Sequence, residues 1–405
     1  MPTLRDAVSS LGANLIPWGS DAAWLPDTFG APEAEYAAIR RHAGILPCGH
    51  RGLVKVTGRD RMDLLNRLAS NKFLDSNPGL ATLGKSKVAA PLVEAGDGRA
   101  IRAFVLGGEG HIRCDFTAFA LGGALWLDTD ATDAVTLAKI INDRVFAEDC
   151  AAENLGAAWS RFTLAGPAAP RLLSLLCGET LAELKPWQAQ NIPLGGETCA
   201  VFRHDQTGTP NLHVWAPSAI EVPLFHAMLE AAGFDPAQPI SAETANLRRD
   251  GLRGRPIGWD AFNTARIEAG HALFHLDFGP DSLPAECGAQ TFAEAVHLNK
   301  GCYPGQEAVA RMHNMGHPKR VVAGLKCEAL PAAGAQVLEG DETKRKSAPR
   351  GGQIGAITGS TMSPMLGATP LALAVVKWGR HAPGTQVAVE VDGVAVKAEV
   401  VGLPV

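Results

Sequence analysis

The C-terminal stretch GTQVAVEVDGVAVKAEVV (residues 384–401) predicts a β-hairpin without any other information. Two apolar runs flank Asp392-Gly393, a dipeptide that strongly favours a two-residue turn between antiparallel strands. Upstream, VVAGLKCEAL, GGQIGAITG and ALAVVKW are further short β runs separated by turn residues. We therefore expect residues 320–405 to form a small β-barrel.

The first 150 residues mix strands with helices. Residues 52–58 alternate between apolar and polar positions as a strand does, and residues 98–116 are typical of a hairpin. Residues 33–43 and 131–145 have the spacing of helices. Because strands and helices do not alternate strictly, an α+β domain with an antiparallel sheet is favoured.

A second strand followed by a helix begins near residue 152, which marks a candidate boundary. We expect an α+β region over residues 1–154, with an inserted subdomain from about residue 53. A second α+β region is expected over 155–319, before the barrel. The charged, apolar-poor segment 339–352 is predicted to be a solvated loop.

Composition excludes several classes of protein. The 405-residue chain has 46% hydrophobic residues and a net charge of −5, without the basic face of a nucleic-acid-binding protein. No run of about 18 apolar residues indicates a membrane span, and the N-terminal stretch does not resemble a signal peptide. Eight cysteines without a C-x-x-C pair favour a reduced, cytoplasmic protein.

Familiar catalytic and metal motifs are missing or incomplete. The chain has no G-x-G-x-x-G, no P-loop and no G-x-S-x-G sequence. Cys287, Cys302, His313 and His317 give C-x14-C-x10-H-x3-H, in which only the H-x3-H half matches zinc spacing. We therefore expect no bound metal, and the two histidines are then part of a basic surface segment.

Arg266 and Glu268 stand two residues apart in ARIEAG (265–270). In a strand, both side chains would point to one face. A carboxylate on a cavity wall suits a ligand with adjacent N–H donors, such as the amidine edge of a pterin. An ion pair at a strand edge is the alternative, and the residues alone leave both interpretations open.

Cys302 is the cysteine with the most particular setting, NKGCYPGQEAVARM (299–312). Gly301 and Gly305 allow an unusual backbone path close to another segment or a ligand. Lys300 could raise the thiolate fraction of Cys302, which would suit a reactive thiol. A glycine-rich turn with an inert cysteine is equally compatible with these residues.

The longer stretch KGCYPGQEAVARMHNMGHPKR (300–320) resembles the signature of the YgfZ family of folate-binding proteins, which are implicated in maintaining iron–sulfur enzymes. The wider superfamily includes the glycine-cleavage T-protein, an aminomethyltransferase that uses tetrahydrofolate. Segments 35–71, 256–278 and 352–376 also resemble parts of this superfamily. The matching positions of the signature are Lys300, Gly301, Cys302, Tyr303, Gly305, Gln306, Glu307, Arg311, Gly316 and Arg320.

The resemblance implies three lobes around a central folate-binding channel, made of two mixed α+β domains and the barrel. It implies tetrahydrofolate or a derivative as cofactor, with Glu268 and Arg266 as contacts. It also implies Cys302 as the key thiol, and iron–sulfur proteins or their assembly machinery as partners. The residues implied around that thiol are Lys300, Tyr303, Gln306, Glu307 and Arg311.

Two departures separate this chain from the T-protein pattern. T-proteins carry an acid pair on a strand in the first half, whereas GRAIRAFVLG (98–107) has Arg102-Ala103 at that place. An arginine cannot accept a proton, and it repels a developing cation. Glu94, Asp97 and Asp115 are acids that could substitute. At the second departure, Pro47-Cys48-Gly49 replaces the usual D-x-S.

These departures lead us to expect a folate-binding protein of iron–sulfur maintenance rather than a standard aminomethyltransferase. The alternative is a tetrahydrofolate-dependent aminomethyl or methyl transferase. A third possibility is that folate binding is lost and that the cavity serves only as a docking surface for proteins.

Overall fold

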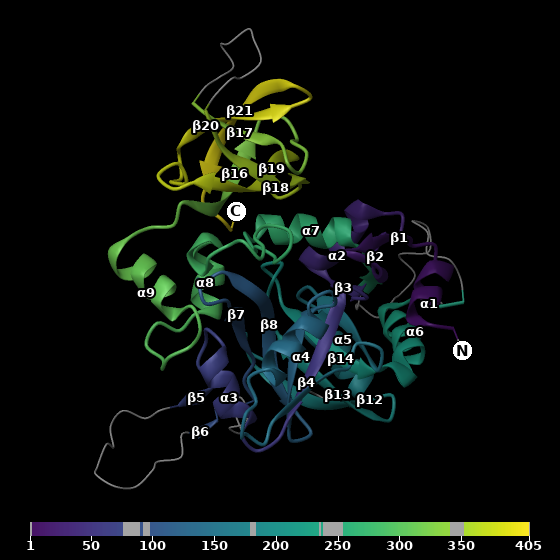
Figure 1. Cartoon of the computed structure of the whole chain (residues 1–405). Helices are drawn as coiled ribbons and strands as arrows, with labels where there is room; N and C mark the ends of the chain where they lie inside the picture. The colour runs from purple at the N-terminus through teal and green to yellow at the C-terminus, as the bar shows by residue number, and fades with distance from the viewer. Residues whose placement is uncertain are drawn as a thin grey trace.

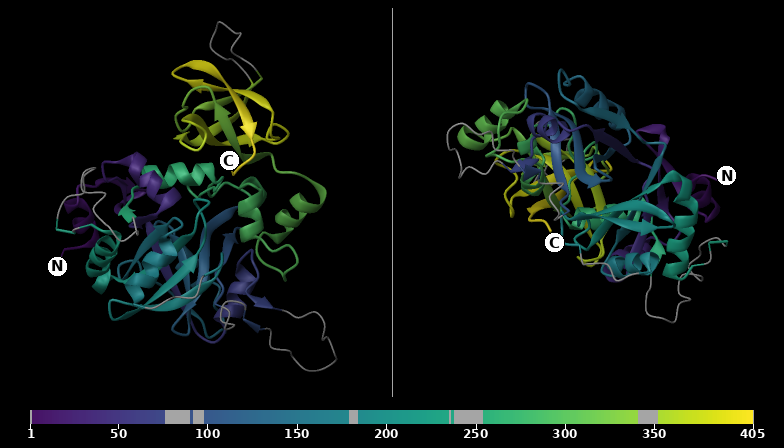
Figure 2. Two further views of the ribbon diagram at one scale, coloured as in Figure 1. Left: turned by 180° about the vertical axis from the view of Figure 1, so that it is seen from behind. Right: turned by 90° about the horizontal axis from the view of Figure 1, so that it is seen from below.

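The computed structural model describes residues 2–75, 90–91, 98–178, 184–234, 236–237, 254–340 and 352–404. The β-barrel forms a lobe at one end, and two sheets with their covering helices form the rest of the molecule (Figures 1 and 2). Glu94, Asp97 and most of the charged segment 339–352 lie outside the described residues.

The first sheet is antiparallel and has five strands. Helices α3 and α4 pack on one face of it through Met62, Leu65, Leu137 and Ile141. In order across the sheet its strands are β10 (Ala151–Asn154), β4 (Arg51–Thr57), β9 (Ala124–Asp130), β8 (Ile112–Leu121) and β7 (Ile101–Leu106), and its helices are α3 (Arg61–Leu68) and α4 (Ala134–Asn142).

The second sheet has six strands and joins distant parts of the chain. Its edge strand pairs in parallel with β3, and every other neighbouring pair is antiparallel. In order the strands are β12 (Ala189–Leu194), β13 (Glu197–Arg203), β14 (Asn211–Pro217), β11 (Trp159–Ala165), β3 (Ala43–Pro47) and β15 (Gly254–Pro256).

Helices cover the second sheet on one side, and the first sheet packs on the other. The covering core contains Leu4, Leu172 and Phe225, one from each of three helices. Phe119 of the first sheet stacks on Phe202 of the second, with ring centroids 5.3 Å apart. The three covering helices are α1 (Leu4–Ser10), α5 (Ala169–Cys177) and α6 (Glu221–Ala232).

Two helices connect these sheets to the barrel. Helices α2 (Pro32–Arg41) and α7 (Trp259–Glu268) pack on each other, and Ile267 of α7 also packs on Leu371 and Leu373 of the barrel. Smaller elements are β1 (Asn14–Trp18), β2 (Ser20–Thr28), β5 (Leu74–Asp75), β6 (Ala90–Pro91), α8 (Ala289–Ala295), α9 (Gln306–Met315) and the 3-10 helices η2 (Ser218–Ile220) and η4 (Pro284–Glu286).

The barrel is closed, and it contains the hairpin that the sequence predicted. Asp392 and Gly393 both have positive φ, at 51° and 77°, which is the two-residue turn expected between right-twisted strands. Its strands, in order around the barrel, are β16 (Arg320–Cys327), β19 (Thr369–Lys377), β18 (Gln353–Ser363), β17 (Gln336–Glu339), β20 (Gln386–Val391) and β21 (Val394–Val401).

The predicted fold class, two mixed α+β parts with a C-terminal barrel, is therefore confirmed. The strand expected at ARIEAG is wrong, because residues 259–268 form helix α7. Within the described part of the chain, no helix combines the length and the apolar character needed to cross a bilayer.

Candidate functional site

A central cavity lies where the two sheets, α7 and the 273–274 segment meet. Polar side chains enter it from β4, β7, β8, β9 and β11, so both sheets contribute to its wall. Its aromatic lining is Trp18, Phe116, Phe202, Trp259, Phe262 and Phe274. Flat apolar walls with a few convergent polar groups are typical of a site for a small ligand.

Strand β9 ends in Asp-Thr-Asp and places two carboxylates on the cavity wall. Asp128 and Asp130 are two residues apart on a strand, so their side chains share a face. Asp128 accepts hydrogen bonds from the half-buried Arg51 and the buried Arg161. Arg51 Nε lies 2.9 Å from Oδ1, and Arg161 Nη1 lies 3.3 Å from Oδ1 and 3.1 Å from Oδ2. This carboxylate is therefore neutralised within the protein.

Asp130 has a different environment, because its partners are neutral. Trp18 Nε1 donates to Oδ2 at 2.7 Å, and the backbone N–H and hydroxyl of Thr132 donate to Oδ1 at 2.9 and 2.7 Å. Asp130 is 5% exposed and lines the cavity. Its direct hydrogen-bond donors carry no charge, although Arg51 lies nearby: burial opposes the charge of Arg51, yet Asp128 and Asp130 help to raise its pKa. The Asp130 carboxylate can therefore also attract a cation that enters the cavity.

Arg102, the residue at the place of the expected acid, is compensated by two carboxylates. Its guanidinium donates to both oxygens of Asp115, at 3.1 and 2.7 Å, and to Glu294 Oε2 at 2.9 Å. Burial opposes the charge of Arg102, yet Asp115 and Glu294 outweigh burial and raise its pKa. Arg102 is thus part of a cluster with Asp115 and Glu294, and this cluster has one net negative charge.

Three nitrogen atoms in the cavity wall are buried without a hydrogen-bond partner in the described residues. They are His50 Nδ1, Arg161 Nε and His204 Nε2. Burial, with Arg51 and Arg161 nearby, holds the pKa of His50 well below its usual range, so the imidazole is neutral. An unpaired buried polar atom costs about 1–3 kcal/mol. A polar ligand in the cavity would remove that cost.

Glu268 and Arg266 are both buried and are held by the protein itself. Glu268 accepts hydrogen bonds from the Tyr36 hydroxyl at 2.6 Å and from the Met365 backbone N–H at 3.2 Å, and it also binds Arg40 and Ser363. It therefore links α2 and α7 to the barrel.

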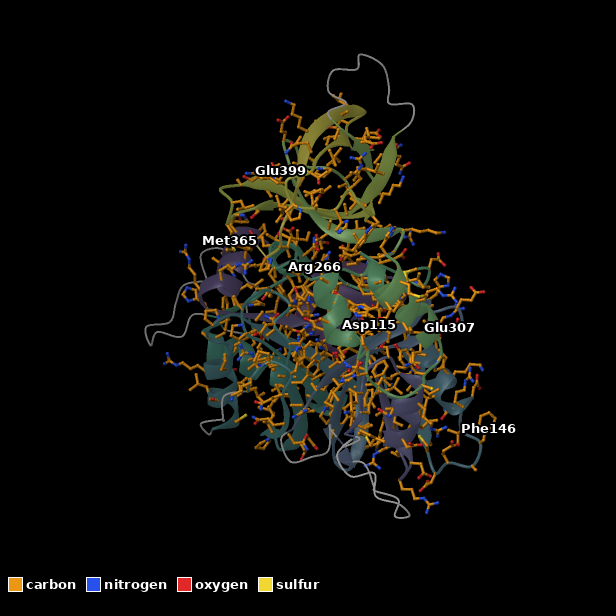
Figure 3. The ribbon with its side chains drawn as sticks, turned by 90° about the vertical axis from the view of Figure 1, so that its left-hand side faces the viewer. Asp115, Phe146, Arg266, Glu307, Met365 and Glu399 are labelled. Carbon is orange, nitrogen blue, oxygen red and sulfur yellow. The ribbon has the colours of Figure 1, made fainter. Side chains whose placement is uncertain are left out.

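Arg266 lies in the interior, and it pairs with Asp277 and donates to the His271 carbonyl oxygen at 3.1 Å (Figure 3). On a helix, residues two apart diverge rather than share a face, so Arg266 and Glu268 have separate partners. Neither residue lines the central cavity.

The signature around Cys302 holds the chain against the first sheet. Cys302 is exposed, whereas Lys300 is buried and donates through Nζ to the carbonyl oxygens of Asn66 at 2.6 Å, Asn71 at 3.0 Å and Ala69. Its ammonium also lies 4.8 Å from the centre of the Tyr303 ring. Lys300 is thus directed at the backbone of the 66–71 segment.

The rest of the signature is also structural in its contacts. Gly305 has φ 78°, and a Cβ atom there would lie 2.7 Å from the Gly107 carbonyl oxygen, so only glycine fits. Gln306, Glu307 and Arg311 belong to α9, where Arg311 pairs with Glu307 at 2.7 Å on an exposed face (Figure 3). These residues do not line the central cavity.

Sequence reasoning missed Asp128, Asp130, Arg161 and His50. A signal for the first two was present, since ALWLDTD ends an apolar strand with acids at alternate positions. Contacts between distant segments bring Arg161 and His50 to the cavity, and the sequence around each residue gives no sign of them. Among the described residues, the side chains that could hold a metal ion together are His204, His271 and Glu294, and not the set Cys287, Cys302, His313 and His317, whose zinc-like spacing is incomplete.

Comparisons with known proteins agree with this architecture. The GCVT N-terminal domain model matches residues 85–299, and the glycine cleavage T-protein C-terminal barrel domain model matches residues 320–405. The "Aminomethyltransferase" of Streptomyces avermitilis is 26% identical over 99% of this chain and 96% of its own length. The "Probable aminomethyltransferase" of Natronomonas pharaonis is 27% identical over 100% of this chain and 98% of its own length.

Among solved structures, the glycine cleavage system aminomethyltransferase T from Bartonella henselae superposes with a TM-score of 0.75. It is 21% identical in sequence, and the match covers 99% of this chain and 96% of that one. At this identity the structural match supports the fold.

Proposed function

This chain belongs to the glycine cleavage T-protein family, and from that premise we propose that it is a tetrahydrofolate-dependent transferase of one-carbon groups, aminomethyl or methyl. The similarity to proteins named aminomethyltransferase over nearly the whole chain supports this proposal. The structural observation that carries it is the central cavity, in which Asp130 accepts hydrogen bonds from neutral donors and three buried nitrogens lack partners in the described residues.

The expectation of a role in iron–sulfur protein maintenance, with Cys302 as the key thiol, is corrected by these relatives. Proteins at 23–27% identity over nearly the full length are named aminomethyltransferase. Iron–sulfur partners have no support in them. The narrower resemblance to the YgfZ branch rests on the 300–320 motif alone, and we place the proposed reaction in the cytoplasm on the composition of the chain.

The residues of the cavity suit a reduced pterin. Trp18 and Trp259 lie edge to face, with centroids 5.3 Å apart, and present aromatic surface on which a flat ring can pack. His50 Nδ1 and Arg161 Nε are available for the nitrogen and oxygen atoms at the ring edge. Tetrahydrofolate, when bound, would supply the nitrogen atoms that receive the one-carbon group.

Binding requires side chains to move, because the enclosed part of the cavity has a volume of about 60 Å³. That volume holds a few water molecules and is smaller than a pterin. Trp18 and Trp259 line the cavity, so their movement gives a fluorescence signal for binding. Titration with folinic acid is therefore expected to change the intrinsic tryptophan fluorescence to saturation.

Arg102 would be expected to repel the positive charge that develops during transfer, but other charges around the cavity offset this effect. Transfer of an aminomethyl group develops positive charge at the carbon that moves. Asp130 offers a preorganised carboxylate whose partners are neutral, and Arg102 has its charge balanced by Asp115 and Glu294. Fixed groups of this kind stabilise a developing charge without reorganisation during the reaction.

The test is formation of methylene-tetrahydrofolate from tetrahydrofolate and an aminomethylated lipoyl donor, with a methyl donor assayed in parallel. We expect turnover with one of the two donor classes. A protein that binds folinic acid but transfers a group from neither donor would contradict the proposed function.

A further inference from the structure

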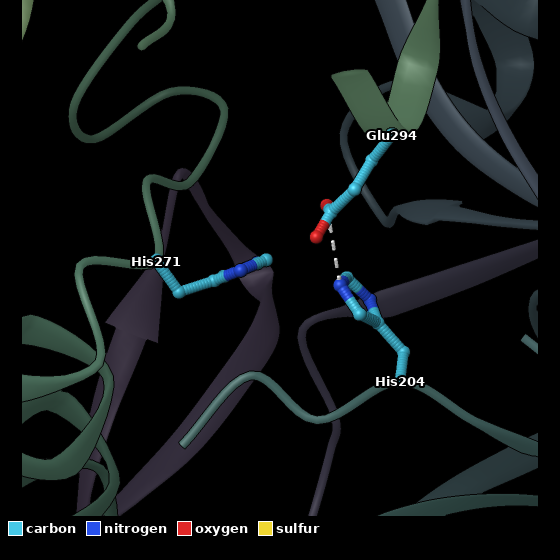
Figure 4. A group of neighbouring side chains, drawn as sticks. All are labelled: His204, His271 and Glu294. Carbon is cyan, nitrogen blue, oxygen red and sulfur yellow. Dashed lines mark ion pairs between the residues drawn. The ribbon is translucent and has the colours of Figure 1, made fainter. Parts of the chain in front are cut away.

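Two buried histidines and one half-buried glutamate from separate segments converge beside the central cavity (Figure 4). His204 directly follows β13, His271 follows α7, and Glu294 belongs to α8. One donor atom from each lies within 4.8 Å of the other two. His204 also lines the cavity, so the cluster borders the proposed folate site.

The distances between donor atoms approach those around a metal ion. His204 Nε2 lies 3.4 Å from Glu294 Oε2, which is too long for a good hydrogen bond. Two ligands at about 2.0–2.2 Å from a tetrahedral zinc ion are themselves roughly 3.4 Å apart. The His204 and His271 rings meet edge to face, with centroids 4.8 Å apart. The three donor atoms lie within 4.8 Å of one another, so they would have to draw closer around an ion.

Both imidazoles carry a nitrogen that the described residues leave unpaired. His204 Nε2 and His271 Nδ1 are buried without a hydrogen-bond partner, and the two residues are 7% and 2% exposed. His204 Nε2 points at the Glu294 carboxylate (Figure 4). A protonated His204 paired with Glu294 would explain only the first of these nitrogens. His271 Nε2 lies 3.3 Å from Gln206 Nε2, so an ion held by His204 Nε2 and His271 Nδ1 would explain both unpaired nitrogens.

The surrounding charges permit a dication. Glu294 Oε2 also accepts from Arg102, while its Oε1 accepts from Gln290 Nε2 at 3.1 Å. The charge of Arg102 is balanced by Asp115, so the Glu294 carboxylate is the net charge of the cluster. Hydrogen bonds to a ligating carboxylate, as from Arg102 and Gln290, are usual around metal sites.

We propose that His204, His271 and Glu294 bind a divalent transition-metal ion. Two imidazoles and one carboxylate form the ligand set of open zinc sites and of the iron sites that keep free positions. The ion would tie together the β13–β14 connection, the segment after α7 and helix α8, on the wall of the cavity. This inference does not depend on the proposed folate reaction.

Calorimetric titration of the chelator-treated full chain with Zn²⁺ tests the site. We expect one equivalent to bind, and we expect Co²⁺ to bind with the intense visible absorption of low-coordinate nitrogen and oxygen ligation. His204→Ala and His271→Ala should each weaken Zn²⁺ binding by roughly 100-fold or more, since even indirect partners of a metal contribute 10–100-fold.

Two further variants guard against loss of folding, and two serve as controls. Glu294→Gln keeps the side-chain volume nearly unchanged, His271→Asn keeps a polar though smaller side chain, and circular dichroism establishes that both variants fold. The double variant His313→Ala/His317→Ala removes the H-x3-H pair on the basic segment, and Cys302→Ser removes the exposed thiol. Both controls should bind Zn²⁺ as the wild type does.

The proposal is overturned if Zn²⁺ affinity is unchanged in folded Glu294→Gln and His271→Asn, or if it is lost in either control. Absence of stoichiometric binding to the wild type overturns it as well. The readout of this experiment is metal binding alone. A failure of the metal-site proposal can therefore be distinguished from a failure of the proposed one-carbon transfer.

Discussion

The indole N–H of Trp18 donates to Asp130 Oδ2 at 2.7 Å and thereby joins the end of β1 to the end of β9 across the cavity wall. Both residues line the cavity. The bond fixes the orientation of the carboxylate to which we assign the stabilisation of charge. Residues near the N-terminus therefore contribute to a site built mainly by the two sheets.

Replacement of Trp18 tests the orientation of that carboxylate. Trp18→Phe keeps an aromatic wall but removes the donor, so Asp130 gains freedom to rotate. We expect kcat/KM for one-carbon transfer to fall by roughly 10- to 150-fold, since loss of one hydrogen bond to a charged group costs about 1.5–3 kcal/mol. Trp378→Phe, at a partly exposed site on the barrel, is the matched control and should leave kcat/KM unchanged.

Arg102 should be essential for stability because this buried guanidinium compensates two half-buried carboxylates. Arg102→Ala leaves Asp115 and Glu294 without their cation, and we expect a loss of about 3–5 kcal/mol in the free energy of unfolding. Urea denaturation measures this loss. Arg67→Ala breaks surface pairs with Asp63 and Glu148 and should cost about 1 kcal/mol or less. Equal effects of the two substitutions would refute the compensating role of Asp115 and Glu294.

Glu268 is expected to stabilise the junction between α7 and the barrel. Glu268→Gln removes the charge that pairs with Arg40 and weakens the contacts with Tyr36 and Ser363. We predict a decrease of about 3 kcal/mol in the free energy of unfolding. Glu307→Gln, on the exposed face of α9, should change it by less than about 0.5 kcal/mol. Weaker folinic acid binding with unchanged stability would instead favour a pterin contact.

The two tyrosines of the chain give a pH test. Burial, together with the hydrogen bond to Glu268, raises the pKa of Tyr36 to about 12, and burial raises the pKa of Tyr303 to about 12. Both phenols should stay protonated at pH 10.5 in the folded protein, whereas in urea they ionise near pH 10. Ultraviolet absorbance of tyrosinate measures this difference.

The effect on stability has a defined sign. The folded state holds these two phenol protons more tightly than the unfolded state does. Their contribution to the free energy of unfolding is therefore complete below about pH 10, and it is lost as the pH rises through about 12. Tyr36→Phe should halve the absorbance change between folded and unfolded protein. Tyrosinate formation near pH 10 in the folded wild type would contradict the burial of both phenols.

Local sequence signals predicted the elements whose chemistry is local. The 384–401 hairpin follows from one dipeptide, and α2, α4 and β4 follow from apolar periodicity. Helix α7 escaped prediction because it is buried nearly all round between α2 and the barrel, which removes the amphipathic pattern. A pair of charged residues two apart then suggested a strand.

The site was less predictable than the fold, because it is made by long-range pairing. The parallel pairing of β15 with β3 joins residues more than two hundred positions apart, and no periodicity encodes it. The same holds for Arg102 and Glu294, which meet through the packing of α8 on β7. The sequence alone led us to expect that Arg102 would repel a developing cation. In the folded protein, two carboxylates from distant segments compensate the charge of Arg102.

The most direct test of the central claim is the rate of one-carbon transfer to tetrahydrofolate in Asp130→Asn. Asparagine keeps the shape of the side chain and removes the charge, so kcat should fall by roughly 100-fold or more. Folinic acid should still bind, and Asp143→Asn, in an exposed pair with Lys139, should behave as the wild type. A wild-type kcat in folded Asp130→Asn would contradict the assignment of Asp130 as the group that stabilises the transferred charge.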